Sequence, residues 1–141
     1  MAKQKINGDQ IGTTGGVWLA YTPTWTGISG GTTSAKYMQI GKTIFFSILY
    51  ICAAEDISGQ TRVTLPTAIA SGSTVIGNVK LTNAGVGSTA GVAEYYNSTT
   101  IRIFACNAGS TYVSYSDLTA SVPFTWGVSD SISITGAYEA A

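Results

Sequence analysis

The chain has 141 residues, a formal net charge of zero and only 10 % charged residues, a size that suits one domain with its own core. So few charges exclude the basic surface that a phosphate backbone demands, and nucleic acid is not an expected partner. Hydrophobic residues reach 45 % of the chain. No apolar run approaches the roughly 20 residues that span a bilayer, so no membrane insertion is expected.

Residues 1–15 are largely polar, with Ile6 and Ile11 as apolar anchors. We expect an N-terminal arm or neck over this segment and a single β-sandwich domain over 16–141. The arm lacks the apolar stretch of a secretory signal, which predicts synthesis in a cytoplasm and retention there, at least at first.

Residues 27–34 are rich in Gly, Ser and Thr, which predicts a flexible loop. The segment 42–52 is the strongest predicted strand, because apolar residues fill both of its alternating faces. One face carries Ile44, Phe46, Ile48, Tyr50 and Cys52, and the other carries Phe45, Leu49 and Ile51. Two apolar faces suggest a sandwich core on one side and a subunit contact on the other.

Shorter alternating segments follow, separated by turn residues that include 55–59. They span 62–65, 74–82, 91–96, 99–105, 111–115 and 131–138. The junction 96–99, Tyr-Asn-Ser-Thr, predicts a short hairpin. No segment has helical apolar spacing, so the sequence predicts an all-β, jelly-roll-like antiparallel β-sandwich of about eight or nine short strands.

Residue types that commonly carry catalysis are scarce, since the chain has no histidine. Glu55 and Asp56 are the only adjacent carboxylates, and in a turn they need not converge on one substrate, so no enzyme activity is expected. Asp56 and Asp130 have no clustered Asp-x-Asp spacing, and neither a metal nor another cofactor is expected. Cys52 and Cys106 fit buried free thiols better than a single disulfide bridge.

Aromatic residues offer two interpretations. Trp18 and Trp126 alternate with apolar neighbours and are predicted to be core residues, whereas Trp25 stands at the mouth of the predicted loop. Candidate ligand-binding residues are Trp25, Tyr95, Tyr96, Asn97, Tyr112 and Tyr115. Exposed tyrosines beside Ser, Asn and Gly are typical of adaptable recognition surfaces, and equally of a subunit interface.

Four groups of residues, taken together, resemble a family of tailed-phage structural proteins over about residues 18–139. They are Trp18-x-x-Tyr21-x-Pro23-x-Trp25, Lys36-Tyr37-x-x-Ile40-Gly41-Lys42-x-Ile44-x-Phe46, Val63-x-Leu65-Pro66, and Trp126-Gly127-x-x-Asp130-x-Ile132-x-Ile134-x-Gly136-x-Tyr138-Glu139. Members of this family are small β-sandwich domains at tail-fibre tips, or minor virion proteins.

The resemblance implies a homotrimer around a fibre axis, in a virion assembled in a bacterial host, with Ile6 and Ile11 of the neck on that axis. As a tail-fibre tip, the domain would bind a glycan or protein of the host surface. As a capsid decoration or head-fibre protein, it would attach to other virion proteins and have a purely structural role. The short arm before the domain fits either an excised fibre tip or a complete small virion protein.

Overall fold

The computed structural model describes residues 16–70, 75–107 and 111–141, and these form β-strands without any helix. The strands are β1 (Leu19–Ala20), β2 (Trp25–Ile28), β3 (Thr32–Ile40), β4 (Thr43–Ile51), β5 (Ile57–Thr64), β6 (Val75–Asn83), β7 (Gly87–Asn97), β8 (Thr100–Asn107), β9 (Ser114–Asp117) and β10 (Ser131–Glu139). The predicted all-β class is therefore confirmed. The predicted arm, with Ile6 and Ile11, lies outside the described residues.

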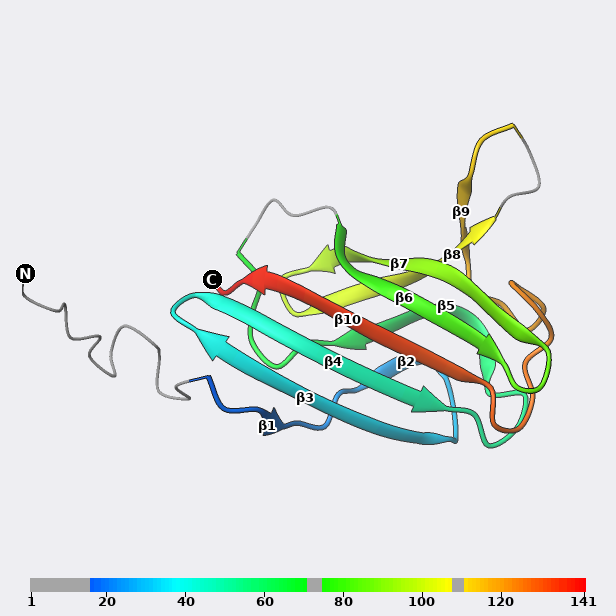
Figure 1. Ribbon diagram of the computed structural model, residues 1–141, viewed down its shortest axis with the longest axis horizontal. Coiled ribbons are helices and arrows are strands. Elements are labelled where there is room, and N and C mark those ends of the chain that lie inside the picture. Colours follow the sequence, from blue (N-terminus) through cyan, green and yellow to red (C-terminus); the bar gives the residue numbers. More distant parts are fainter. Residues whose placement is uncertain (1–15, 71–74, 108–110) are drawn as a thin grey trace, which may run out of the picture.

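All these strands belong to one antiparallel sheet, ordered β1-β3-β4-β10-β6-β7-β8-β5-β2, with β9 paired to β8. The sheet curls, so that β2 and β5 pass behind β3, β4 and β10 (Figure 1). The Trp25 ring on β2 lies 5.3 Å from the Tyr50 ring on β4, and the Trp25 Nε1 donates a hydrogen bond to the Thr33 Oγ1 on β3 at 3.0 Å. Strands from opposite ends of the order thus meet through side chains around a shared core.

The predicted strand 42–52 corresponds to β4, which lies between β3 and β10. Ile44, Phe46, Ile48 and Tyr50 are buried, whereas Phe45, Leu49 and Ile51 are 37–40 % exposed. Burial of each large apolar side chain contributes about 1.5–3 kcal/mol. The predicted core face is confirmed, and the second apolar face is open to solvent in the single chain.

A close approach between β10 and its neighbours depends on Gly136. This residue pairs with Phe46 of β4 on one side and with Gly77 of β6 on the other. A Cβ atom at Gly136 would lie 2.8 Å from the Gly77 Cα and 2.9 Å from the Phe46 ring. Because Gly136 has no side chain, the Phe46 ring can lie over the backbone of β10.

The two tryptophans predicted to be core residues differ. Trp126 is buried, and its Nε1 donates a hydrogen bond to the Thr119 carbonyl at 3.1 Å, which confirms the prediction. The prediction for Trp18 is wrong, since this side chain is 45 % exposed. The physical reason is its position beside β1, an edge strand whose one neighbour in the sheet is β3.

Three predicted boundaries also need correction. The loop predicted over 27–34 is wrong at both ends, because β2 continues to Ile28 and β3 begins at Thr32. The turn predicted over 55–59 is wrong from Ile57 onward, where β5 begins and pairs with Ile28 across a register shift. The strand predicted over 111–115 instead runs from Ser114 to Asp117. Pairing with distant segments extends strands through stretches whose Gly and Ser content favours loops.

Candidate ligand-binding surface

Adjacent tyrosines near the end of β7 point to opposite faces, as strand alternation requires. Tyr95 pairs with the buried Ile101 and packs against the core. Tyr96 is 44 % exposed on the outer side of the curl. Asn97 supports the predicted hairpin to β8, because its Oδ1 accepts the Thr99 N–H at 3.0 Å. Of the three predicted site residues at this hairpin, Tyr96 is therefore the one whose ring faces outward.

The other predicted site residues lie on two different sides of the sheet. Tyr115 on β9 is 51 % exposed, and its ring lies 6.4 Å from that of Phe104 on β8. Tyr112 is exposed shortly before β9, a strand that projects from the body (Figure 1). Trp25 does not join them, because its cross-strand partner Val63 is buried and it faces the inside of the curl.

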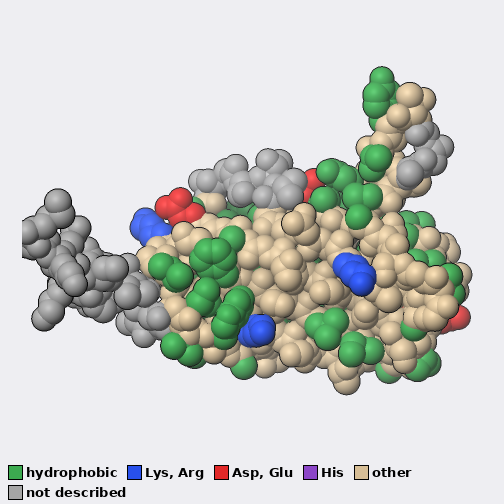
Figure 2. Space-filling model, viewed as in Figure 1, with side chains coloured by type: hydrophobic (Ala, Val, Ile, Leu, Met, Phe, Trp, Pro, Cys, Tyr) green, Lys and Arg blue, Asp and Glu red, His purple; other side chains and the backbone are tan. Residues whose placement is uncertain are grey.

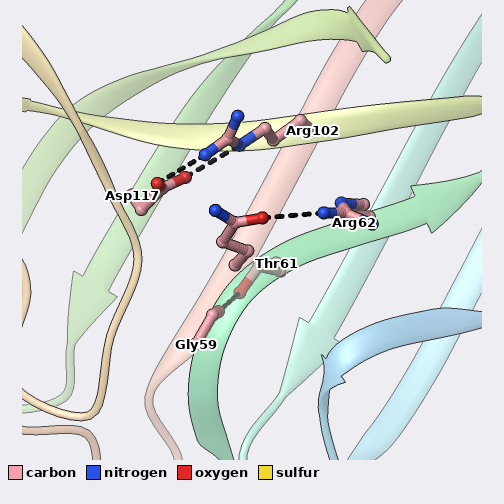
Figure 3. Close-up of polar contacts among 6 residues, drawn as sticks. Gly59, Thr61, Arg62, Arg102 and Asp117 are labelled. Carbon is pink, nitrogen blue, oxygen red and sulfur yellow. Dashed lines mark hydrogen bonds and ion pairs between the residues drawn. The ribbon is translucent and has the colours of Figure 1, made fainter. Parts of the chain in front are cut away.

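Two arginines that the sequence analysis missed lie on the same outer face as Tyr96. Arg62 of β5 and Arg102 of β8 are direct cross-strand partners, and Figure 3 shows them on neighbouring strands. The next residues along each strand, Val63 and Ile103, are buried, so alternation directs both arginines outward. That alternation was a usable signal in the sequence, but the pairing of the two strands was not.

Arg102 is neutralised within the chain. Its Nε donates to the Asp117 Oδ1 at 2.8 Å, and its Nη2 pairs with the Asp117 Oδ2 (Figure 3). Its guanidinium lies 4.7 Å from the centroid of the Phe104 ring. The two side chains of the ion pair are 25 % and 30 % exposed. At such exposure the pair contributes at most about 1 kcal/mol, so its main effect is to hold the Arg102 guanidinium in place.

Arg62 has a different set of partners. Its guanidinium lies 3.9 Å from the centroid of the Tyr96 ring, and its Nη2 donates to the Gln60 Oε1 at 2.7 Å. Its Nε is buried and has no hydrogen-bond partner among the described residues. A cation over an aromatic face gains about 0.5–2 kcal/mol. The Tyr96 ring therefore orients a guanidinium whose charge no carboxylate of the described chain neutralises by direct contact.

These groups define what we call the arginine-tyrosine surface: Arg62, Tyr96, Arg102, Phe104, Tyr115 and Asp117. Like charges directly opposite one another destabilise a sheet, and the pairing of Arg102 with Asp117 reduces that repulsion between Arg62 and Arg102. Glu94 of β7 is the cross-strand neighbour of Arg102 on the side away from β5. Two strand spacings, about 10 Å, separate its backbone from that of Arg62.

Two hollows lie elsewhere on the surface. One, of about 490 Å³, is formed by the β6–β7 turn, the end of β8 and Phe124. The other, of about 390 Å³, lies on the outer face of β3, β4 and β10, with Trp18, Lys36 and Phe45 among its lining residues. The Lys36 Nζ lies 5.0 Å from the centroid of the Trp18 ring. Figure 2 shows this face, where apolar side chains gather around a few basic ones.

The buried carboxylates stabilise loops. The Asp56 Oδ2 accepts the Ala53 N–H at 2.6 Å and the Tyr50 hydroxyl at 3.0 Å. Burial raises the pKa of Tyr50, and the hydrogen bond to Asp56 raises it further. Glu55 is exposed, whereas Asp56 is buried, so the two carboxylates lie in different environments. Within the described ranges no three metal-ligating side chains converge.

Both cysteines are free, Cys52 buried and Cys106 partly exposed. Over the same described part of the chain there is no helix able to span a membrane. Comparisons of the chain with protein-family models, with curated proteins and with solved structures found no match.

Proposed function

We propose that this chain is a tail-fibre tip domain of a tailed phage, which attaches the virion to the bacterial surface through the arginine-tyrosine surface. The observation that carries the proposal is Arg62, a guanidinium held against the Tyr96 ring with no carboxylate partner among the described residues. An arginine held against an aromatic ring is a frequent anchor of binding sites. Binding of this kind needs no catalytic group.

Residues of the motifs that resemble tailed-phage structural proteins act in this chain as parts of the scaffold. Gly136 lies under Phe46, whose ring is 5.9 Å from that of Tyr138. The Asp130 carboxylate accepts the Ala84 and Gly127 N–H groups, each at 2.7 Å. These residues hold strands and turns together, and none of them lies on β5, β8 or β9. A scaffold that is separate from the proposed binding face suits a receptor-binding domain.

We propose further that the curled sheet acts as a jelly-roll-like sandwich in a homotrimer, with Phe45, Leu49 and Ile51 of β4 at the subunit contact. Exposed apolar side chains on a central strand favour such a contact, since obligate interfaces resemble a divided core. Three copies would also raise the strength of attachment through effective concentration. Light scattering should then give about 44 kDa, three times the 14.6 kDa of one chain.

The same apolar face favours a second function, capsid decoration, in which β4 docks on other virion proteins and no host ligand is bound. The surface to which the chain binds, a bacterial cell or a capsid, distinguishes the two functions. Fluorescently labelled chain should coat cells of a susceptible strain from a bacterial panel, and Arg62→Gln should reduce the coating while Lys80→Gln, which removes a cation of the β6 surface, should not. Saturable coating of fibre-stripped capsids, without coating of any cells, would favour decoration and contradict the fibre-tip proposal.

A further inference from the structure

We infer that the arginine-tyrosine surface binds an anionic saccharide, whose acidic group pairs with Arg62 and whose ring lies against the exposed tyrosines. The inference rests on the proposed attachment function and names the chemical class of its ligand. Three features of the surface lead to it: a cation without an acidic partner, a neutral acceptor that an anion can replace, and aromatic rings beside amide and hydroxyl groups.

The first feature is the charge of Arg62. Among the described residues one ion pair is formed, between Arg102 and Asp117, so no carboxylate lies within 4.0 Å of Arg62. Glu94 faces outward two strands away, on the far side of Arg102. The neutralised Arg102 therefore stands between Glu94 and Arg62. An acidic group of a ligand would meet the Arg62 charge directly.

The second feature is the hydrogen bonding of Arg62. Its Nη2 donates to the Gln60 Oε1, which is neutral. An anionic oxygen would add charge–charge attraction to the hydrogen bond that the neutral Gln60 oxygen now accepts, so an anion can displace the Gln60 amide. The displaced amide, which belongs to an exposed residue within β5, remains free to bind a ligand hydroxyl. The planar guanidinium also matches a carboxylate or phosphate with two parallel N–H donors.

The third feature is the arrangement of rings around this cation. Tyr96 and Tyr115 expose 44 % and 51 % of their surface, and Phe104 lies between Arg102 and Tyr115. Rings of this kind offer a flat apolar face with a polar edge, as a pyranose ring also does. Tyrosine with Asn, Gln and Thr neighbours provides adaptable hydrogen bonds at low conformational cost. A sugar can therefore lie on the rings while its acidic group reaches Arg62.

The size of the surface favours a saccharide over a macromolecular polyanion. Nucleic-acid binding depends on many phosphate contacts, and this surface has one unpaired arginine in a chain of zero net charge. A peptide would bind differently, by adding a strand to a sheet edge such as β9. The anion itself has two sources in saccharides, a uronic acid carboxylate or a sugar phosphate, and both fit the guanidinium.

The test is a titration of the ¹⁵N-labelled 141-residue chain, followed by NMR signals of the backbone and of the arginine Nε–H groups. The probes are trigalacturonic acid, its neutral methyl ester, glucose 6-phosphate, glucose and a tetraglutamate peptide. We expect trigalacturonic acid or glucose 6-phosphate to shift the Arg62 Nε–H signal and the signals of β5, β8 and β9, and its neutral counterpart not to do so. Shifts with the first acid identify a carboxylate ligand, and shifts with the second a phosphate ligand.

Matched variants complete the test. Arg62→Gln should weaken binding of the acidic probe at least about tenfold, Tyr115→Ala should weaken it less, and Lys80→Gln should leave it unchanged. Unshifted backbone signals away from the surface show that each variant is folded. Binding of tetraglutamate alone, equal binding of the neutral sugars, or no shift with any probe would each overturn the inference.

The same variants separate this inference from the proposed function. If Arg62→Gln abolishes the coating of cells but no acidic sugar binds or competes, the attachment proposal stands and the ligand class is wrong. If acidic sugars bind at Arg62 while Arg62→Gln leaves the coating of cells unchanged, the saccharide site stands and the attachment proposal fails.

Discussion

Asp130 is a buried carboxylate that connects the start of β10 to two turns, and its replacement by Asn tests how much the loops depend on charge. The Oδ1 atom accepts the Ala84 N–H and the Oδ2 atom accepts the Gly127 N–H, both at 2.7 Å, while the residue is 4 % exposed. An Asn side chain has the same shape but one acceptor oxygen. Its NH₂ group would face a backbone N–H, so one hydrogen bond is lost and a partly buried donor loses its acceptor.

The magnitude follows from these two terms. A hydrogen bond to a charged group contributes about 1.5–3 kcal/mol, and a buried donor without a partner costs about 1–3 kcal/mol, part of which is already counted in the first term. We therefore expect Asp130→Asn to lower the free energy of unfolding by about 2–4 kcal/mol, a large fraction of the roughly 5–15 kcal/mol of a typical domain. The loss arises at whichever of the Ala84 and Gly127 N–H groups faces the new NH₂ group.

The assay is urea unfolding followed by tryptophan fluorescence, which reports on the buried Trp126. Asp117→Asn is the matched control, because the same chemical change there breaks a partly exposed ion pair that contributes at most about 1 kcal/mol. An Asp130→Asn variant within about 0.5 kcal/mol of the parent chain, or no less stable than Asp117→Asn, would refute the reasoning.

Three further predictions concern packing and titration. Ile48→Ala should lower the free energy of unfolding by about 2–5 kcal/mol, whereas Leu49→Ala, on the exposed face, should cost less than about 1 kcal/mol and reduce the native mass in light scattering; equal losses of stability would contradict the two-sided account of β4. Gly136→Ala should cost about 1–3 kcal/mol in thermal unfolding, since the new methyl group meets the backbone of β6, and an unchanged melting temperature would contradict that close approach. Burial, and then the nearby buried carboxylates, raise the pKa of Cys52 to about 11 from 9.0, so iodoacetamide should modify Cys106 first. The contribution of the protonated Cys52 thiol to the free energy of unfolding should be complete below pH 9 and decline as pH rises to about 11. A free energy of unfolding that stays constant over this pH range, or faster modification of Cys52 than of Cys106, would contradict this prediction.

The sequence pattern succeeded where local alternation is strong and failed where strands depend on partners. The segment 42–52 was recognisable because its apolar residues alternate without interruption, and β4 follows that prediction closely. The start of β5 was not recognisable, since Ile57-Ser58-Gly59-Gln60 has the composition of a turn. It forms a strand because Ile28, far away along the chain, supplies hydrogen-bonding partners. The prediction for Trp18 was wrong for a related reason. Alternation shows which residues share a face of a strand, but it does not show whether another layer covers that face.

The candidate site divides in the same way. Adjacent tyrosines on a strand must face opposite sides, so the sequence was enough to predict that one of Tyr95 and Tyr96 leaves the core. It did not show which one, because that depends on which side of β7 the curled sheet encloses. Nor did it show Arg62, whose importance comes from Tyr96 and from the absence of a nearby carboxylate among the described residues.

The sequence by itself determined the all-β class, the core face of β4 and the lack of histidine chemistry, because composition and period-2 alternation are local properties of the chain. The tertiary structure decided which strands are neighbours. Arg62 and Arg102 are distant in sequence, and only antiparallel pairing of β5 with β8 places them side by side. Pairing between strands depends on loop closure and on the curl of the whole sheet, which no short stretch of residues specifies.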